Sequence, residues 1–119
     1  MLRQVPVLLA YSSIKGGSGM ILTDSDFNSI IESNELVLVD FWAEWCGPCR
    51  KLSPILEELS SETGLLVGKL NVDENPVKTS EYAVSSIPTM ILFKGGSPVT
   101  TIIGAKPKHL LLKDLSEWI

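Results

Sequence analysis

The sequence predicts a single α/β domain, a mixed five-stranded sheet with four helices packed on its two faces. Two observations carry this prediction. Apolar segments of strand length alternate with amphipathic segments of helical length through the first two thirds of the chain, which is typical of parallel strands joined by crossover helices. Two further apolar segments then flank a glycine-rich turn and predict an antiparallel hairpin, followed by a last amphipathic segment.

The first strand and the first helix are predicted directly after a glycine-rich stretch. Met20–Leu22 is a short apolar segment, and Thr23 and Asp26 stand three positions apart in a loose capping-box pattern. The apolar side chains that follow at helical spacing are Phe27, Ile30 and Ile31. We therefore expect a strand and then an amphipathic helix at the start of the domain.

Two apolar segments predict the centre of the sheet. Leu36–Trp42 is interrupted only by Asp40, and Leu66–Val72 is the second candidate for a buried strand. Apolar runs of this length are typical of strands that are covered on both faces. Between them, apolar residues at helical spacing predict a helix from about Cys46 to Glu62.

The C-terminal third is predicted to hold a short helix, a hairpin and a last helix. Asn75 is the expected cap of the short helix, with Pro76 in its first turn. Met90–Lys94 and Val99–Ile103 are the expected hairpin strands, and Pro107 begins the last helix. The predicted order of elements is therefore βαβαβαββα.

The charge of the chain divides it into two parts. Residues 1–19 carry two basic and no acidic side chains, whereas residues 20–119 carry eight basic and fourteen acidic ones, which accounts for the net charge of −4. We interpret 1–19 as an extension or linker and 20–119 as the domain. The extension could be a targeting remnant, an upstream extension from a misassigned start, or an extra edge element.

The composition also excludes some classes of function. The acidic balance argues against nucleic acid as a partner, because phosphate binding needs clustered Lys and Arg. No apolar run approaches the roughly 20 residues that span a bilayer, so we expect a soluble protein.

The most informative feature is the cysteine pair Cys46 and Cys49, which stands where a buried strand meets a helix. A disulfide across so short a loop would restrain the unfolded chain by only about 2 kcal/mol, so a purely structural role is a poor explanation. Even with His109 the chain lacks the four ligands of a structural zinc site, although a dimer could supply them. We therefore predict redox chemistry.

The two thiols are expected to be unequal. Cys46 lies at the helix tip, where free N–H groups favour an anion. We expect it to be the more exposed and more readily ionised thiol, and therefore the nucleophile. Cys49 lies on the core-facing stripe and is predicted to attack second. Gly47 allows a tight turn, and Pro48 suits the first turn of the helix.

Asp40 is the second informative residue, because an acid within an apolar strand loses its hydration. Burial would raise its pKa and make it a usable proton carrier beneath Cys49. The alternative is a buried acid that merely pairs with a base, for which Lys69 in the next buried strand is the obvious partner. Both interpretations can hold together, since Lys69 could tune Asp40.

Two aromatic residues and one proline flank these candidates. We expect Trp42 to be a packing residue and Trp45, in the loop before the cysteines, to be an exposed apolar contact. Pro88 precedes a strand, and the sequence alone gives no reason to expect a cis bond there.

Four stretches resemble the thioredoxin family: Val39–Cys49, Lys69–Pro76, Ile87–Thr89 and Gly104. The resemblance covers residues 20–119. It implies the thioredoxin fold, with the strands ordered third, first, second, fourth and fifth, and a cis bond at Pro88 beside the cysteines. It also implies that Asp40 is the buried proton acceptor with Lys69 as its neighbour, and that the substrate-binding surface comprises Trp45, Gly47, Pro48, Ile87, Pro88, Gly104 and Ala105.

The sequence departs from that family at two places on the expected docking rim. Ser85–Ser86 stands where many members have a basic residue and a glycine, and 106–108 adds two lysines that predict a positive patch. Both departures affect the choice of partner and leave the chemistry unchanged.

The resemblance implies a general protein-disulfide reductase with a redox-active disulfide at Cys46 and Cys49. It implies no bound metal or organic cofactor; a flavoenzyme thioredoxin reductase would supply electrons from NADPH, and disulfide-containing proteins would receive them. We expect a cytoplasmic monomer, or an organellar protein if 1–19 is a targeting remnant. Two alternatives stay open: an oxidant or isomerase in an oxidising compartment, and a docking subunit that needs no redox turnover.

Overall fold

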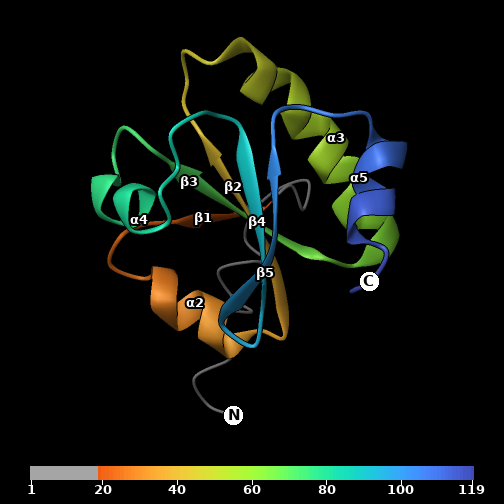
Figure 1. The fold of residues 1–119 in the computed structure, drawn as a ribbon, viewed down its shortest axis with the longest axis horizontal. Helices are drawn as coiled ribbons and strands as arrows, with labels where there is room; N and C mark the ends of the chain where they lie inside the picture. The colour runs from red at the N-terminus through yellow and green to blue at the C-terminus, as the bar shows by residue number, and fades with distance from the viewer. Residues whose placement is uncertain (1–18) are drawn as a thin grey trace.

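Five strands and four helices alternate along residues 19–119, which are the part of the chain that the computed structural model describes (Figure 1). The predicted order of elements is confirmed, and the predictions for residues 1–18 lie outside the described residues. The elements are β1 (Met20–Leu22), α2 (Phe27–Ser33), β2 (Leu36–Trp42), α3 (Gly47–Thr63), β3 (Leu66–Asn71), α4 (Pro76–Glu81), β4 (Thr89–Lys94), β5 (Ser97–Ile103) and α5 (Lys108–Leu115).

The strands form one mixed sheet in the order β1-β3-β2-β4-β5. β1 and β2 are both parallel to β3, whereas β4 is antiparallel to β2 and to β5. The predicted position of the first strand, between the third and the second, is wrong. β1 has only three residues, and Ile21 at its middle is exposed, so it suits the edge of the sheet better than the centre.

The two faces of the sheet are covered by different helices. Figure 1 shows α2 and α4 on one side of the sheet and α3 and α5 on the other. Along β2, Val37, Val39 and Phe41 pack into the cluster that includes the α2 side chains, whereas Leu38 packs with α3 and α5. Because side chains alternate along a strand, Asp40 shares the α3 face with Leu38.

The helix starts differ in detail from the predicted patterns. Before α2, the Asp26 carboxylate accepts a hydrogen bond from the Thr23 N–H at 2.7 Å, which is half of a capping box. Helix α3 begins at Gly47, with Cys46 as its N-cap. None of the helices within residues 19–119 is long and apolar enough to cross a membrane.

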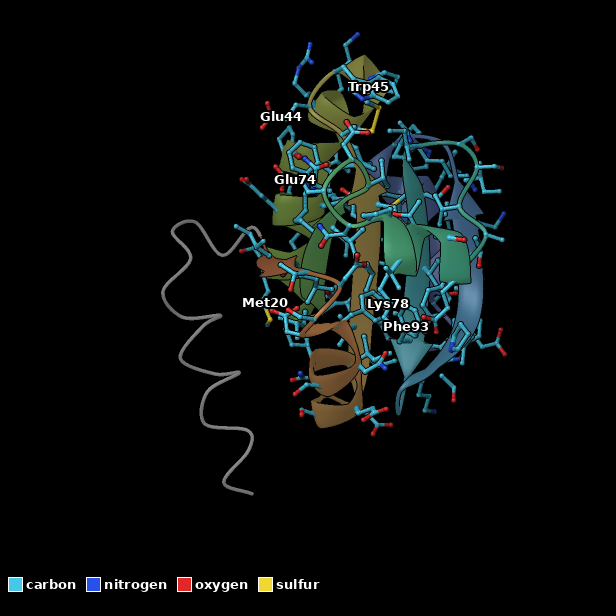
Figure 2. The ribbon with its side chains drawn as sticks, turned by 90° about the vertical axis from the view of Figure 1, so that its left-hand side faces the viewer. Met20, Glu44, Trp45, Glu74, Lys78 and Phe93 are labelled. Carbon is cyan, nitrogen blue, oxygen red and sulfur yellow. A yellow bond between two sulfur atoms is a disulfide. The ribbon has the colours of Figure 1, made fainter. Side chains whose placement is uncertain are left out.

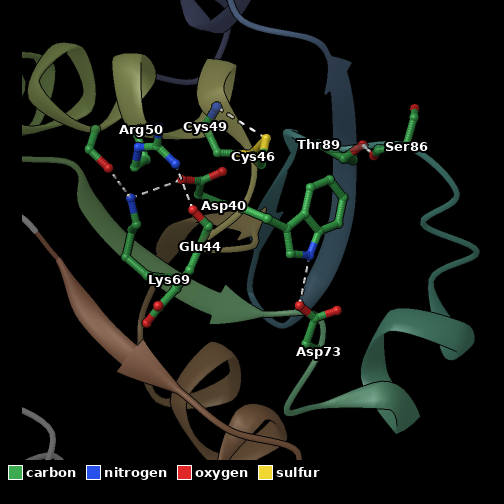
Figure 3. The surroundings of a disulfide bond; sticks show 11 residues. Asp40, Glu44, Cys46, Cys49, Arg50, Lys69, Asp73, Ser86 and Thr89 are labelled. Carbon is green, nitrogen blue, oxygen red and sulfur yellow. Dashed lines mark hydrogen bonds and ion pairs between the residues drawn. A yellow bond between two sulfur atoms is a disulfide. The ribbon is translucent and has the colours of Figure 1, made fainter.

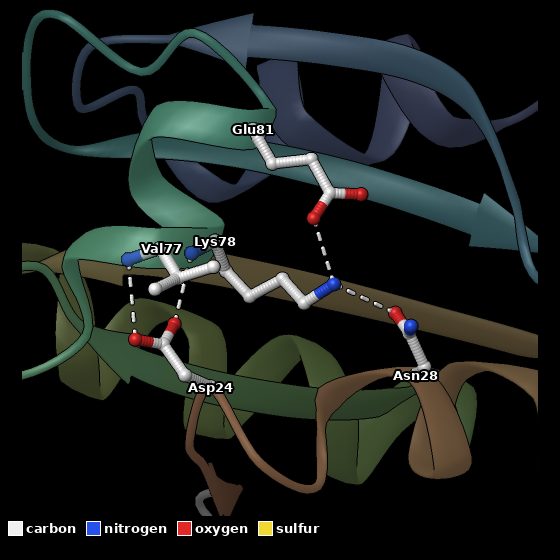
Figure 4. Close-up of polar contacts among 5 residues, drawn as sticks. All are labelled: Asp24, Asn28, Val77, Lys78 and Glu81. Carbon is white, nitrogen blue, oxygen red and sulfur yellow. Dashed lines mark hydrogen bonds and ion pairs between the residues drawn. The ribbon is translucent and has the colours of Figure 1, made fainter.

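Helix α4 has a cap that the sequence did not suggest. The predicted cap, Asn75, makes no side-chain capping bond. Instead the Asp24 carboxylate, from the loop after β1, accepts hydrogen bonds from the N–H groups of Val77 at 3.1 Å and Lys78 at 2.8 Å (Figure 4). A non-local acid therefore satisfies the free donors at the start of α4.

The hairpin between β4 and β5 is tighter than predicted. The second strand begins at Ser97, two residues before the expected start, because Gly95 and Gly96 turn the chain alone with φ of 58° and 86°. Two consecutive positive φ values are typical of a two-residue hairpin turn, which glycine adopts without strain.

Candidate active site

Cys46 and Cys49 form a disulfide at the start of α3, with their Cα atoms 5.3 Å apart. The Cys46 Sγ also accepts a hydrogen bond from the Cys49 N–H at 3.2 Å, so the first turn of the helix directs a free donor at this sulfur. Both residues are buried, with 4% and 1% of their surface exposed. The expected difference in exposure is therefore small in the disulfide form.

Apolar side chains surround the cysteine pair. Ala43 packs with both cysteines, and Trp42, Val72 and Ile87 lie against this cluster. The Ile87–Pro88 peptide bond is cis, as the resemblance implied and the sequence alone did not.

The segment around that proline is tied to the end of β5. The Pro88 carbonyl accepts a hydrogen bond from the Gly104 N–H at 2.8 Å. Thr89 Oγ1 donates to the Ser86 carbonyl at 2.6 Å (Figure 3). The loop before β4 and the loop after β5 therefore meet, and Ile87 brings this junction against the cysteines.

Trp45 is exposed, as predicted, with 69% of its surface accessible. Figure 2 shows it at one end of the molecule, far from Phe93 and Lys78. Its indole Nε1 donates a hydrogen bond to Asp73 Oδ2 at 2.8 Å (Figure 3). Asp73 was not among the site residues predicted from the sequence, although Asp73 lies within the Lys69–Pro76 stretch on which the resemblance rests.

A shallow hollow adjoins the cysteine loop and contains both aromatic and hydroxyl groups. Its lining residues are Trp45, Val72, Thr79, Val84, Ser85, Ser86 and Ile87. The two serines that depart from the family pattern therefore lie beside Trp45 and Ile87, where we expected the docking rim.

The other predicted contact residues lie around the same end of the molecule. Gly47 and Pro48 lie between the cysteines in the first turn of α3, Gly47 half-buried and Pro48 exposed. Gly104 is half-buried at its bond to Pro88, and the exposed Ala105 follows it.

Asp40 is fully buried and faces a lysine on the neighbouring strand. The register of β2 and β3 places it directly opposite Lys69, and Lys69 Nζ lies 3.1 Å from Asp40 Oδ2 (Figure 3). Burial raises the pKa of Asp40, and the positive charge of Lys69 opposes that rise only in part. Both predicted features, the desolvated acid and its pairing with Lys69, are present.

The contact between these two residues is an ion pair without an aligned hydrogen bond. Within residues 19–119, neither carboxylate oxygen of Asp40 has a hydrogen-bond partner. Figure 3 shows the carboxylate directed towards the start of α3, the side on which Cys49 lies.

Lys69 is held by two further side chains. Its Nζ donates a hydrogen bond to Ser53 Oγ on α3 at 2.7 Å and lies 5.6 Å from the centre of the Trp42 ring. Ser53 was not among the site residues predicted from the sequence. Its position four residues after Cys49 was the available signal, because that spacing places the two side chains on one face of a helix.

Arg50, Lys106 and Lys108, three cations near the site, have partners. Arg50 donates a hydrogen bond to the Glu44 carbonyl at 2.7 Å and so bridges α3 to the loop before the cysteines. Lys106 pairs with Asp114, while Lys108 lies 3.1 Å from Glu58 and 2.6 Å from Glu62. The predicted positive patch at 106–108 is wrong, because these acids neutralise both lysines.

Residues 19–119 hold no cluster of three or more His, Cys, Asp or Glu side chains that could bind a metal ion. The zinc alternative would therefore need ligands from another chain, and the two cysteines are bonded to each other.

Comparisons with known proteins agree with this geometry. The family model described as Thioredoxin matches residues 18–117. The thioredoxin of Alicyclobacillus acidocaldarius subsp. acidocaldarius is 52% identical over 100 residues, which cover 82% of this chain and 95% of that protein. The bifunctional thioredoxin reductase/thioredoxin of Mycobacterium leprae is 56% identical over 101 residues, 82% of this chain and 22% of that protein.

A solved structure extends the agreement to three dimensions. The thioredoxin of Plasmodium falciparum superposes with a TM-score of 0.77 at 40% identity, covering 83% of this chain and 98% of that one. Sequence, fold and the Cys46–Cys49 disulfide thus agree: the chain belongs to the thioredoxin family and is a thiol–disulfide oxidoreductase with protein-disulfide reductase activity.

Proposed function

We propose that the chain works as a general reductase of protein disulfides, with Cys46 as the attacking and Cys49 as the resolving thiol. The observation that carries this assignment is the hydrogen bond from the Cys49 N–H to Cys46 Sγ at the helix N-terminus. The same donor would stabilise a thiolate on Cys46 once the disulfide is reduced. No equivalent donor faces Cys49 among the hydrogen bonds of residues 19–119.

The reaction balances with no bound cofactor. The Cys46 thiolate attacks one sulfur of a client disulfide, the client S–S bond breaks, and the departing client sulfur takes a proton from water. Cys49 then loses its proton and attacks Cys46 Sγ, which releases the second client sulfur. Two electrons pass to the client, and the Cys46–Cys49 disulfide remains.

Asp40 is the proposed acceptor of the Cys49 proton, through a water molecule. Its burial and raised pKa support this role, since a carboxylate whose pKa lies above its ordinary value is a stronger proton acceptor. Lys69 is proposed to tune Asp40 by its charge, because its ammonium is 3.1 Å from the carboxylate.

Clients are proposed to dock over Trp45, Gly47, Pro48, Ile87, Pro88, Gly104 and Ala105. The support is the exposure of Trp45, the hollow that it shares with Ile87, and the bond between Gly104 and Pro88. An extended client segment would lie across this surface with its disulfide at Cys46.

The recharging partner is proposed to be a thioredoxin reductase that draws electrons from NADPH. The Mycobacterium leprae relative, described as a bifunctional thioredoxin reductase/thioredoxin, supports this pairing. We further propose that residues 20–119 act as a monomeric domain in the cytoplasm and that residues 1–19 are an extension to it. Sequencing the N-terminus of the protein from its native source would test whether that extension is retained.

The test is reduction of insulin disulfides in the presence of NADPH and a thioredoxin reductase. The wild type should turn over, Cys46→Ser should not, and Cys49→Ser should accumulate a mixed disulfide through Cys46. A wild type no faster than Cys46→Ser would overturn the proposal. Partners that persist with a Cys46→Ser, Cys49→Ser variant would favour the docking subunit, and a potential near −120 mV would favour the oxidant.

A further inference from the structure

The position of the Lys69 ammonium depends on one directed contact. Lys69 Nζ approaches Asp40 Oδ2 to 3.1 Å, yet Asp40 accepts no hydrogen bond from any residue in the described range. The hydrogen bond that fixes Nζ is the one to Ser53 Oγ at 2.7 Å. A charge attraction alone is weakly directional, whereas a hydrogen bond sets both distance and angle.

On its outer side, Lys69 borders a hollow. Its side chain is 17% exposed and lines a hollow of about 150 Å³ together with the side chains of Glu44 and Glu74. Both glutamates are exposed. An ammonium that turned into this hollow would be hydrated and near two carboxylates, which is a favourable setting for a cation.

We propose that Ser53 is a positioning residue that holds the Lys69 ammonium against Asp40 and keeps it out of the hollow lined by Glu44 and Glu74. Ser53 lies on α3 and Lys69 on β3, so this hydrogen bond ties the helix that carries the cysteines to the strand that faces Asp40. The inference rests on the proposed role of Asp40 in proton transfer and adds a residue that sets it.

Among the groups that face Asp40, Lys69 carries the positive charge. From β3 it faces Lys69, from β4 it faces the uncharged Met90, and from α3 it faces the cysteine pair. In the disulfide form the cysteines do not titrate. Loss of the nearby ammonium should therefore raise the pKa of Asp40, because an opposite charge within about 4–6 Å favours the ionised acid.

The experiment follows the Asp40 carboxyl carbon by ¹³C NMR through a pH titration of the oxidised protein. Ser53→Ala should move the titration midpoint up by about one pH unit, the low end of the effect of an adjacent opposite charge. Ser53→Thr, which keeps a hydroxyl, should restore the wild-type midpoint. Ser60→Ala is the matched control, since Ser60 is a buried serine of the same helix whose hydroxyl donates to the Leu65 carbonyl at 2.7 Å.

The outcomes distinguish a failure of the positioning role of Ser53 from a failure of the proposed role of Asp40. A midpoint in Ser53→Ala that is unchanged, lower, or equal to a shift in Ser60→Ala would overturn the positioning role. The proposed role of Asp40 in proton transfer instead fails if Asp40→Asn reduces client disulfides as fast as the wild type. Because the titration is measured without turnover, either result can be obtained without the other.

Discussion

Lys69 and Lys78 are two lysines in similar surroundings with different consequences. Each ammonium lies over an aromatic ring, 5.6 Å from the centre of Trp42 and 5.4 Å from that of Phe27. Each also contacts one neutral polar side chain and one carboxylate. Lys78 donates to Asn28 at 3.0 Å and to Glu81 at 2.7 Å (Figure 4), whereas Lys69 has Ser53 and Asp40.

The difference lies in the acid. The side chain of Glu81 is half exposed, and it accepts a hydrogen bond from its lysine. The carboxylate of Asp40 is fully buried and accepts none within the described part of the chain. A half-exposed, hydrogen-bonded acid contributes to structure, whereas burial without a hydrogen bond raises the pKa of an acid and favours its protonated form. The burial of the acid, more than the lysine, therefore distinguishes the Asp40–Lys69 pair from the Lys78 cluster.

The largest expected effect is on the rate of disulfide reduction when Asp40 or Glu81 is replaced by its neutral amide. Asp40→Asn should slow disulfide reduction at neutral pH by about 10²-fold, since a positioned base contributes at least that much. Glu81→Gln should leave the rate unchanged. Stopped-flow measurement of mixed-disulfide resolution checks both. Equal losses in the two variants would remove the distinction between the clusters.

The next largest effect is expected when Lys69 or Lys78 is replaced by methionine, a neutral side chain of similar length. Lys69→Met should raise the midpoint of the pH–rate profile by about one pH unit or more, because Asp40 loses the opposite charge that favours its ionised form. Lys78→Met should leave that midpoint in place. Reduction rates measured across the pH range decide, and a shift in both variants would assign the effect to general destabilisation.

Stability should depend on pH through the burial of Asp40. The pKa of Asp40 is raised above its ordinary value of 3.8, so the folded protein binds this proton more tightly than the unfolded chain. Stability from this site is therefore full below about pH 4 and is lost as pH rises through the raised pKa, by at most about 1.4 kcal/mol per pH unit.

Urea unfolding of the oxidised protein at several pH values measures this dependence. Asp40→Asn should flatten the decline and be more stable than the wild type on the alkaline side. A wild-type stability that rises with pH in this window would contradict the sign.

The smallest expected effect concerns the cap that the Lys78 cluster adjoins. Asp24→Ala removes the acceptor of the Val77 and Lys78 N–H groups and should lower the free energy of unfolding by about 1 kcal/mol, a usual cost for a lost N-cap. Asp24→Asn keeps one acceptor oxygen and should lose less. The pH–rate profile should not move in either variant, which turnover assays can verify.

Local patterns in the sequence were sufficient to predict the order of helices and strands and the buried Asp40–Lys69 pair. Apolar spacing predicted the described elements other than α4, which Asn75 and Pro76 predicted. The lone acid of Leu36–Trp42 and the lysine of the next buried strand predicted the Asp40–Lys69 pair. These features depend on periodicity and on the cost of burying a charge, both of which are visible in one short segment.

The errors and omissions concern contacts between distant segments. The edge position of β1 depends on which side of β3 offers free hydrogen-bonding groups. The sequence of β1 alone does not predict which side that is. Asp24 caps a helix more than 50 residues away, and Ser53 meets Lys69 across the helix–sheet interface. Such contacts are set by how elements pack, so a residue type alone could not assign them.

The hairpin turn at Gly95 and Gly96 has a practical consequence. β4 begins at Thr89, directly after the cis bond at Pro88, and runs away from the cysteines to Lys94, a span of about 20 Å at the usual rise per residue. The turn therefore stands at the opposite end of the strand from the redox pair. A fluorophore or short affinity tag inserted there would give a handle for immobilising or tracking the protein while its docking surface stays open to clients and reductase.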